Sequence, residues 1–249
     1  MLSLDRQNAW REAYRASHPE WQPATELYAD LVRQQLTPEA RVLDIGCGRG
    51  GLVEQLDHPL GQVVGIDPDW LSLREHRLNL TGAVAFSDDL PFAPESFDVA
   101  FASWVLEHLE RPFLTFQSIA RVLKPGGVFV FITPNGRHPL ALLNQTMGKL
   151  GALQGKLVAG LYGRSADDTF ATHYRANSQS ALEKLAAQTG LNLAQLHAIP
   201  DPTYLAFNRP LFQLMALVED ALPAGRKIHL VGVLVKGATT DLSNSGLTQ

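Results

Sequence analysis

The chain has 249 residues, of which 45% are hydrophobic and 18% charged, and its formal net charge is −4. This length and composition predict one α/β domain with a full apolar core and argue against a second autonomous domain. With this weakly acidic net charge, the sequence shows no stripe of basic residues of the kind that binds phosphate backbones. We therefore expect a small-molecule partner and no nucleic acid.

The cysteine content and the N-terminal residues indicate the expected compartment. Cys47 is the single cysteine, which excludes an intrachain disulfide framework. Residues 1–6 lack the basic start and apolar core of a signal peptide, and no apolar run approaches the roughly 20 residues of a membrane span. We therefore expect a cytoplasmic protein without an integral membrane segment.

Residues 1–36 predict a flap followed by a helix. Trp10, Tyr14 and Trp21 lie among charged residues in a segment that we expect to fold over the site. After Pro23, apolar residues recur at helical spacing as far as Gln35, so this helix is expected to pack on a sheet.

From residue 40 onward, short apolar runs alternate with helical patterns. Several of these runs are apolar on both faces, which predicts a sheet covered by helices on both sides. The expected strands are 42–45, 61–67, 83–86, 99–103, 128–132, 192–199 and 228–236. The expected helices follow the first glycine loop and span about 69–79, 112–123, 178–189 and 210–222.

Residues 136–176 interrupt this alternation and predict a helical cap inserted after the fifth strand. Glycines at 148, 151, 155, 160 and 163 divide weakly apolar helices here. The leucines of the cap form either a lid for a hydrophobic acceptor or a face buried in the core or in a dimer. The single domain would then comprise the flap and helix 1–36, a cofactor-binding core 37–135, the cap 136–176, the remaining sheet 177–237 and a flexible tail 238–249.

A glycine-rich loop after the first expected strand is the main candidate for ligand binding. Gly46, Gly48, Gly50 and Gly51 allow backbone conformations and close approach that a Cβ would prevent. Apolar residues after the loop have helical spacing, which predicts a helix N-terminus facing the electron-rich atoms of a ligand.

The spacing Gly46-x-Gly48-x-x-Gly51, with Asp67 about 20 residues downstream, satisfies the dinucleotide fingerprint. An NAD-dependent oxidoreductase is therefore one interpretation. However, Asp44 directly precedes the loop, where its carboxylate would repel a diphosphate but suit a cationic amino acid group. A non-catalytic module that only holds the cofactor is a further alternative.

The motifs together resemble the class I S-adenosylmethionine-dependent methyltransferases. They are Val42-Leu-Asp-Ile-Gly-Cys-Gly-Arg-Gly50, Val64-Gly-Ile-Asp67, Leu90-Pro-Phe, Ser96-Phe-Asp98, Leu106-Glu-His-Leu109 and Arg121-Val-Leu-Lys-Pro-Gly-Gly127. More narrowly, the chain is similar to the bacterial small-molecule methyltransferase group whose best-known members act on ubiquinone and menaquinone precursors. The resemblance covers about residues 40–135 and implies a Rossmann-like, doubly wound, seven-stranded sheet, mostly parallel with an antiparallel last strand.

The resemblance also implies a site for S-adenosylmethionine. Asp44 would bind the ammonium group, Asp67 the ribose hydroxyls, and Pro68 and Asp69 would lie beside the adenine. For the adenine amino group we choose Asp88 first and Asp89 second, because Phe86 stands where the family often has the acid. The remaining expected cofactor residues are Gly46, Cys47, Gly48, Leu90, Ser103 and Trp104.

Two of these cofactor residues also have structural interpretations. Asp67 would otherwise cap the following helix, and Asp44 would accept hydrogen bonds from loop amides. Cys47 is interpreted as a small loop residue and not as a reactive thiol, because nothing nearby in sequence would activate it.

Methyl transfer to an alcohol or phenol requires removal of a proton, and His108 is the candidate base because it follows the fourth strand. The alternative is that His108 only begins the next helix or contacts the methionine end of the cofactor. The candidate acceptor residues are Tyr14, His138, His173, Tyr174, Arg175 and Tyr204, and no metal site is expected. We thus predict a methyltransferase, monomeric or homodimeric, acting on a small-molecule or lipid-linked acceptor, more often at oxygen than at nitrogen or carbon.

Overall fold

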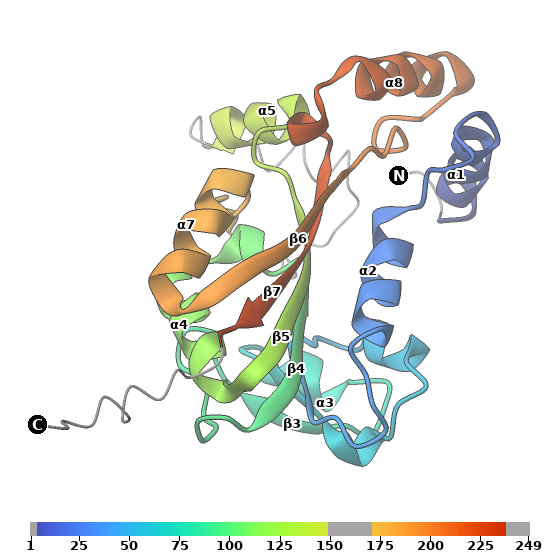
Figure 1. Ribbon diagram of the computed structural model, residues 1–249. Coiled ribbons are helices and arrows are strands. Elements are labelled where there is room, and N and C mark those ends of the chain that lie inside the picture. The colour runs from blue at the N-terminus through green and yellow to red at the C-terminus, as the bar shows by residue number, and fades with distance from the viewer. Residues whose placement is uncertain (1–3, 149–170, 238–249) are drawn as a thin grey trace, which may run out of the picture.

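The computed structural model describes residues 4–148 and 171–237 (Figure 1). A single seven-stranded sheet runs through the molecule in the order β3-β2-β1-β4-β5-β7-β6. Its strands are β1 (Val42–Ile45), β2 (Val63–Asp67), β3 (Thr81–Val84), β4 (Phe97–Ser103), β5 (Leu123–Pro134), β6 (Leu191–Ile199) and β7 (His229–Lys236). β7 pairs antiparallel with both β5 and β6, whereas the pairs from β3 to β5 are parallel. The predicted sheet is confirmed.

This strand order places a ligand-binding crevice at a defined edge. The chain moves outward from β1 through β2 to β3 and then returns to β4 on the other side of β1. In open α/β sheets, ligands bind beyond the carboxyl ends of the strands at such a reversal. The loops after β1, β2 and β4 therefore define the site.

Helices cover both faces of the sheet, as expected (Figure 1). α2 (Ala24–Arg33) packs on β5 and β7, and α4 (Pro112–Val122) and α7 (Gln179–Thr189) lie on the opposite face. Successive strand residues point to opposite faces. Accordingly, Phe129 and Phe131 of β5 join the core under α4 and α7, while Val130 and Ile132 join the core under α2.

Local sequence signals explain where the helices begin and end. Ser178 caps the N-terminus of α7 by accepting from the Ala181 N–H, and Gly190 ends the helix in the left-handed conformation. Asn208 caps α8 (Arg209–Ala221) in the same way, and Asp69 caps the short α3 (Trp70–Arg74).

The helix predicted after the glycine loop is wrong. Residues Leu52–Gln55 form a single 3₁₀ turn, after which the chain extends at Leu56. Leu52 and Val53 are buried against the α2 side of the sheet, so their apolar character reflects packing of a turn and not a helical stripe. The glycine loop thus presents its own amides, with no long helix behind it.

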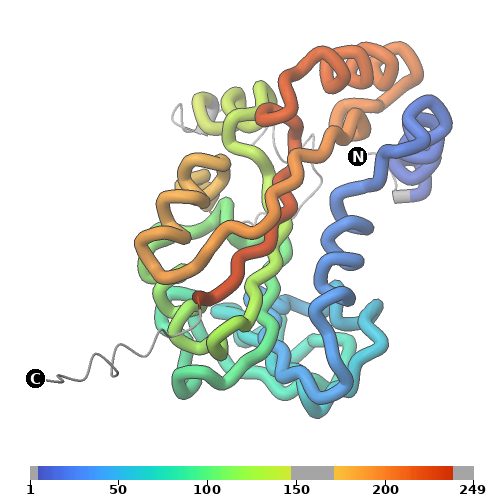
Figure 2. Tube along the Cα trace, in the orientation of Figure 1, coloured from blue at the N-terminus to red at the C-terminus, as the bar shows by residue number. Residues whose placement is uncertain are grey.

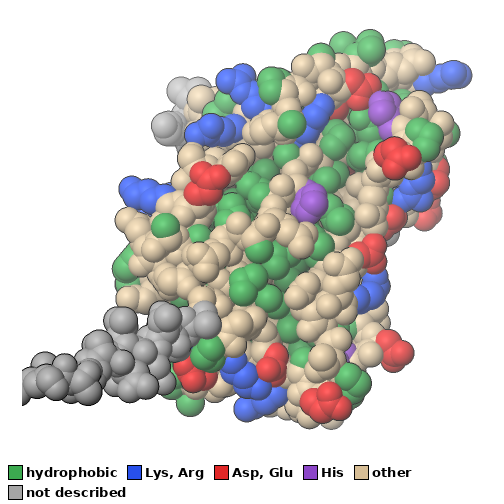
Figure 3. Space-filling view, in the orientation of Figure 1, with side chains coloured by type: hydrophobic (Ala, Val, Ile, Leu, Met, Phe, Trp, Pro, Cys, Tyr) green, Lys and Arg blue, Asp and Glu red, His purple; other side chains and the backbone are tan. Residues whose placement is uncertain are grey.

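α1 (Leu4–Ser17) packs against α8 beyond the carboxyl edge of the sheet (Figure 2). The rings of Trp10 and Phe212 stack at 4.6 Å, and the Tyr14 hydroxyl lies 2.6 Å from an Asp220 carboxylate oxygen. Hydrophobic side chains also remain at the surface of this end of the molecule (Figure 3).

The predicted cap falls largely on residues 149–170, which lie outside the described residues, as does the tail from 238. Its described part is α5 (Pro139–Gly148) together with residues 171–176. Within residues 4–148 and 171–237, no helix combines the length and hydropathy needed to cross a membrane.

Candidate functional site

The glycine loop begins as an extension of the β1–β2 pairing. The N–H groups of Gly46 and Cys47 both donate to the Ile66 carbonyl, at 2.8 and 3.0 Å. Gly46 has a φ of +74°, and a Cβ at this position would lie 2.5 Å from Cγ2 of Val105. A glycine is therefore required where the loop passes the segment that follows β4.

Asp67 ends β2 and holds the loop in place. One carboxylate oxygen accepts from the Gly48 N–H at 2.9 Å, and the other accepts from the Asp69 N–H at 2.8 Å. A carboxylate has about four acceptor positions, so the two remaining positions suit the vicinal hydroxyls of a ribose. The loop-holding role and the ribose-binding role are compatible.

Asp44 lies one strand away, and its side chain is buried. Burial, and then the nearby Asp67 carboxylate, raise the pKa of Asp44 to about 8. Both causes disfavour the charged form, and neither is a neighbouring cation. A ligand ammonium group would supply the missing positive charge.

Cys47 is buried in the loop as a thiol. Burial, together with the Asp44 and Asp67 carboxylates, raises its pKa to about 12. A thiol with so high a pKa is a poor nucleophile at neutral pH. This agrees with the interpretation of Cys47 as a small loop residue.

The three acids that the sequence places near the adenine, Asp69, Asp88 and Asp89, differ in their contacts and in their exposure. Asp69 accepts from the Leu71 and Ser72 N–H groups and is the cap of α3. Asp88 is half-buried and pairs with Arg111 at 2.6 Å, whereas Asp89 is exposed. The side chain of Leu90 is buried in the core, so only its backbone can face a ligand.

Trp104 follows Ser103 at the carboxyl end of β4. Its φ is +57°, and its N–H donates to the Ile132 carbonyl at 3.0 Å. Its ring lies edge-on to His229, with ring centroids 5.1 Å apart. Trp104 thus links the segment after β4 with the start of β7.

His108 belongs to the 3₁₀ turn Leu106–His108 and does not begin α4. Nδ1 lies 3.0 Å from the Ala171 carbonyl oxygen, which can only accept, so Nδ1 carries the hydrogen. In the neutral ring, the lone pair then resides on Nε2. The residue is half-buried.

The triplet His173-Tyr174-Arg175 lies against this same turn. The N–H groups of His173 and Tyr174 both donate to the Glu107 carbonyl, at 2.7 and 3.2 Å. Arg175 donates to the Glu110 carbonyl. The structure therefore brings the predicted triplet and His108 together, through backbone contacts that the sequence could not show.

Tyr14 and His138 are buried in contacts with α8. Tyr14 is paired with Asp220, and burial raises its pKa. His138 is fully buried with Nε2 3.2 Å from the Glu219 carboxylate, and its Nδ1 accepts from the Leu140 N–H. These contacts favour structural roles for both residues.

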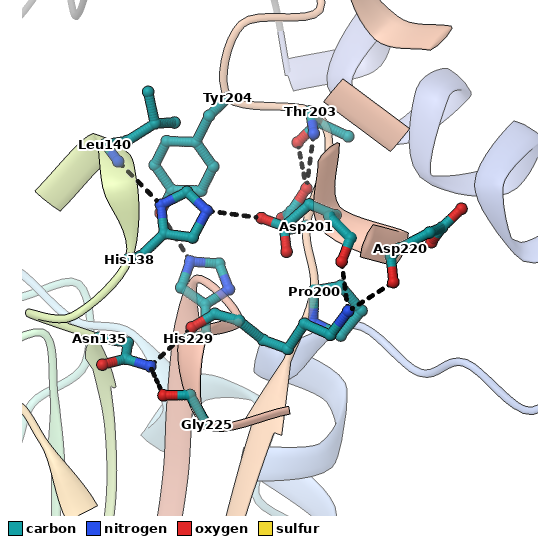
Figure 4. A network of polar contacts seen from close by, with 12 residues as sticks. Asn135, His138, Leu140, Pro200, Asp201, Thr203, Tyr204, Asp220, Gly225 and His229 are labelled. Carbon is teal, nitrogen blue, oxygen red and sulfur yellow. Dashed lines mark hydrogen bonds and ion pairs between the residues drawn. The ribbon is translucent and has the colours of Figure 1, made fainter. Parts of the chain in front are cut away.

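The sequence reasoning missed His229, the first residue of β7. Figure 4 shows Tyr204, His138 and His229 converging from three different elements. The Tyr204 hydroxyl lies 2.7 Å from Nε2 of His229, and burial lowers the pKa of His229 to about 4. The signal was available: in an antiparallel last strand, the first residue lies at the carboxyl edge of its neighbours, here opposite Pro134 and Ile199.

The comparisons with known proteins address the cofactor half of this site. Residues 43–131 match the family model described as a methyltransferase domain. They contain the glycine loop, Asp44, Asp67 and Trp104. Residues 43–131 are thus a methyltransferase domain of the class I S-adenosylmethionine-dependent kind.

Two relatives of this chain illustrate the range of similarity. A ubiquinone biosynthesis O-methyltransferase of Hahella chejuensis is 38% identical over 119 residues, which are 45% of this chain and 50% of the relative. A demethylmenaquinone methyltransferase of Chlorobaculum parvum is 29% identical over 223 residues, which are 83% of each chain. The chain thus spans about half the length of the Hahella relative.

Solved structures agree on the fold. An S-adenosylmethionine-dependent methyltransferase from Mesorhizobium loti has a TM-score of 0.57 and 18% identity, covering 83% of this chain and 96% of that one. A chain from the complex of Haloferax volcanii Trm112 with a putative methyltransferase has a TM-score of 0.61 and 19% identity, covering 94% of this chain and 96% of that one.

Among the described residues, no group of three or more His, Cys, Asp or Glu side chains is arranged to hold a metal ion.

Proposed function

We propose that this chain transfers the methyl group of S-adenosylmethionine to an oxygen atom of a small-molecule or lipid-linked acceptor. The observation that carries the proposal is the pair of carboxylates beside the glycine loop. Asp44 is buried, and its pKa is raised by burial and by Asp67, with no contribution from a cation that would lower it. Asp67 holds the loop with two hydrogen bonds and still has acceptor positions for a ligand. Together they suit an ammonium group and a ribose.

The residues of the site fit this cofactor in size and polarity. Gly46 lies so close to Val105 that a side chain is excluded, which keeps the loop backbone accessible to the ligand. Asp88 would accept from the adenine amino group beside its Arg111 partner, and Pro68 would lie against the ring. When bound, S-adenosylmethionine supplies an electrophilic methyl group on a positively charged sulfur.

The protein mainly orients the acceptor and takes up its proton. A nucleophilic oxygen must be in line with the transferred methyl group, in a site that excludes water. His108 is the candidate base, because its Nδ1–H is held by the Ala171 carbonyl and Nε2 then carries the lone pair. Trp104, Tyr204, His173, Tyr174 and Arg175 are the proposed acceptor residues.

The oxygen preference rests on the relatives. Several of them are named ubiquinone biosynthesis O-methyltransferases, and another is named a demethylmenaquinone methyltransferase. A phenolic precursor of a quinone is therefore the acceptor class that we propose to test first.

The test is a methyl-transfer assay with S-adenosylmethionine and three acceptors: a catechol, a quinol with a short isoprenoid tail, and a primary amine. Mass spectrometry would detect the methylated product and S-adenosylhomocysteine. We expect an O-methylated catechol or quinol. Transfer to the amine alone would contradict oxygen as the target, and cofactor binding without any product would favour a non-catalytic module.

The role of His108 is tested with His108→Asn in the same assay. We expect turnover to fall by about 10²- to 10⁴-fold, the usual contribution of general base catalysis, with unchanged cofactor affinity. His197→Asn, in a half-buried residue of β6, is the matched control. Normal turnover of His108→Asn across the pH range would assign His108 to a structural role.

A further inference from the structure

Helix α8 is apolar on two opposite sides. Phe212, Met215 and Glu219 face inward and are buried. Leu211, Leu214 and Leu217 follow one another at a spacing of three on the outer side, and Leu217 is 68% exposed. A helix that is apolar around its circumference is normally covered on both sides.

α5 extends this exposed apolar surface. Its Leu142 and Leu143 are 48% and 55% exposed. Both helices lie at the same end of the molecule, beyond the carboxyl edge of the sheet (Figure 1), and His138, just before α5, contacts Glu219 of α8. We call Leu142, Leu143, Leu211, Leu214 and Leu217 the leucine surface.

Positive charge accompanies the leucine surface. Arg137 and Arg226 are exposed and, together with Leu142 and Gly225, line a hollow of about 400 Å³. Within the described parts of the chain, neither arginine pairs with a carboxylate, and α5 contains no acidic residue. Arg209, at the start of α8, is also exposed.

The acidic residues of α8 do not counter this charge. Glu219 is fully buried beside His138, and Asp220, whose side chain is 41% exposed, is paired with Tyr14 of α1 and with His18 just after it. The exposed side of this end therefore combines aliphatic side chains with guanidinium groups, although the net charge of the whole chain is negative.

We propose that the leucine surface binds the surface of a bilayer that contains anionic lipids. The leucines would enter the boundary between headgroups and acyl chains, and Arg137 and Arg226 would contact lipid phosphates. This interaction goes beyond the proposed methyl transfer and does not depend on it. It would bring the carboxyl edge of the sheet close to a lipid-linked acceptor.

A second copy of this chain fits the same surface less well. A two-fold interface places the same patch on both sides, so the arginines of the two copies would approach one another. Among the described residues of α5 and α8, the one exposed carboxylate, Asp220, already contacts Tyr14 and His18, and such like-charge contacts disfavour association.

The test is flotation of the full chain with vesicles of phosphatidylcholine alone or mixed with phosphatidylglycerol. We expect binding to the mixed vesicles. The double variant Leu214→Ser/Leu217→Ser should lower the partition coefficient on the order of tenfold or more, because two apolar side chains are lost from the boundary. Arg137→Gln and Arg226→Gln should each lower it about fivefold on anionic vesicles only.

Leu60→Ser and Lys184→Gln are the matched controls, because both residues are exposed and lie outside the leucine surface. Circular dichroism would confirm that every variant is folded. Absence of vesicle binding by the unaltered chain would overturn the proposal. So would vesicle binding that the leucine variant leaves unchanged, or a dimer in solution that the leucine variant abolishes.

Titration of the same proteins with S-adenosylhomocysteine separates this proposal from the proposed function. We expect equal cofactor affinity for the unaltered chain and the leucine variant. If the leucine variant loses vesicle binding but keeps cofactor binding, the result bears only on the leucine surface. If the unaltered chain does not bind the cofactor, the result contradicts only the proposed methyl transfer.

Discussion

At the residue scale, two carboxylates one strand apart have different environments. Asp67 accepts two backbone N–H groups at the end of β2, while burial and Asp67 raise the pKa of Asp44 to about 8. We therefore propose different ligand groups for them: hydroxyl donors for Asp67 and a cation for Asp44.

Replacing Asp67 by alanine should weaken binding of S-adenosylhomocysteine by about 10- to 150-fold. This range corresponds to the roughly 1.5–3 kcal/mol of a hydrogen bond to a charged group. Isothermal titration calorimetry would measure it, with Asp98→Asn as a control, since Asp98 pairs with Lys124 at the opposite edge of the sheet. Unchanged affinity would remove Asp67 from the ribose site.

Replacing Asp44 by asparagine should stabilise the unliganded protein at alkaline pH while weakening cofactor binding. The folded-state pKa of Asp44, about 8, lies above the unfolded value of 3.8, so the folded state binds more protons between these limits. Stability therefore falls as pH rises through this window, and between pH 6 and 8 the loss is about 2 kcal/mol.

Urea denaturation of both proteins at pH 6 and pH 8 would measure this effect. The wild type should lose stability relative to Asp44→Asn as the pH rises. An equal difference between the two proteins at both pH values would show that Asp44 does not titrate in this range.

The residue scale also shows the limit of sequence reasoning. The places of Asp44, Gly46 and Asp67 at the ends of strands were predictable, because each adjoins a strand with a clear apolar pattern. His229 was missed although an antiparallel last strand places its first residue at the carboxyl edge; only its contact with Tyr204 needed the folded structure. The burial of His138 likewise depends on a helix that follows it by about 70 residues.

At the element scale, the glycine loop and the segment after β4 are packed too closely for a side chain at position 46. Gly46→Ala should destabilise the protein by about 1–3 kcal/mol, because its φ is +74° and the new Cβ would meet Val105. Val105→Ala in the same chain should recover part of the loss. Thermal denaturation of the two single variants and the double variant would test this, and strictly additive losses would contradict the contact.

The connection between α5 and α8 depends on the buried pair His138 and Glu219. His138→Ala leaves the Glu219 carboxylate buried without this partner and should cost about 3–5 kcal/mol. Glu219→Gln, which removes the charge and nearly keeps the shape, should cost clearly less. Chemical denaturation would compare them, and equal losses would show that charge is not the cause.

The elements themselves were largely predictable, with one instructive failure. Caps and breakers such as Ser178 and Gly190 mark helix ends in the sequence. After the glycine loop, however, apolar residues at helical spacing form only a 3₁₀ turn. Leu52 and Val53 are apolar because they are buried in the core, not because they lie on one face of a helix. A short apolar pattern cannot distinguish these two cases.

At the scale of the whole molecule, the family resemblance implied a seven-stranded, mostly parallel sheet with an antiparallel last strand, and the structure confirms it. The side where we propose that the acceptor binds was less predictable, because it brings together the segment after β4, residues 173–175, the segment after β6 and the start of β7. These segments contact one another only in the folded chain. The sequence therefore indicates the cofactor more clearly than the acceptor.

The central claim is that the glycine loop with Asp44 and Asp67 binds S-adenosylmethionine and not a dinucleotide. Calorimetric titration of the full chain with S-adenosylhomocysteine and, separately, with NAD tests it most directly. We predict binding of S-adenosylhomocysteine at one site, weakened by Asp67→Ala and by Asp44→Asn, and no binding of NAD. Binding of NAD without binding of S-adenosylhomocysteine would contradict the claim.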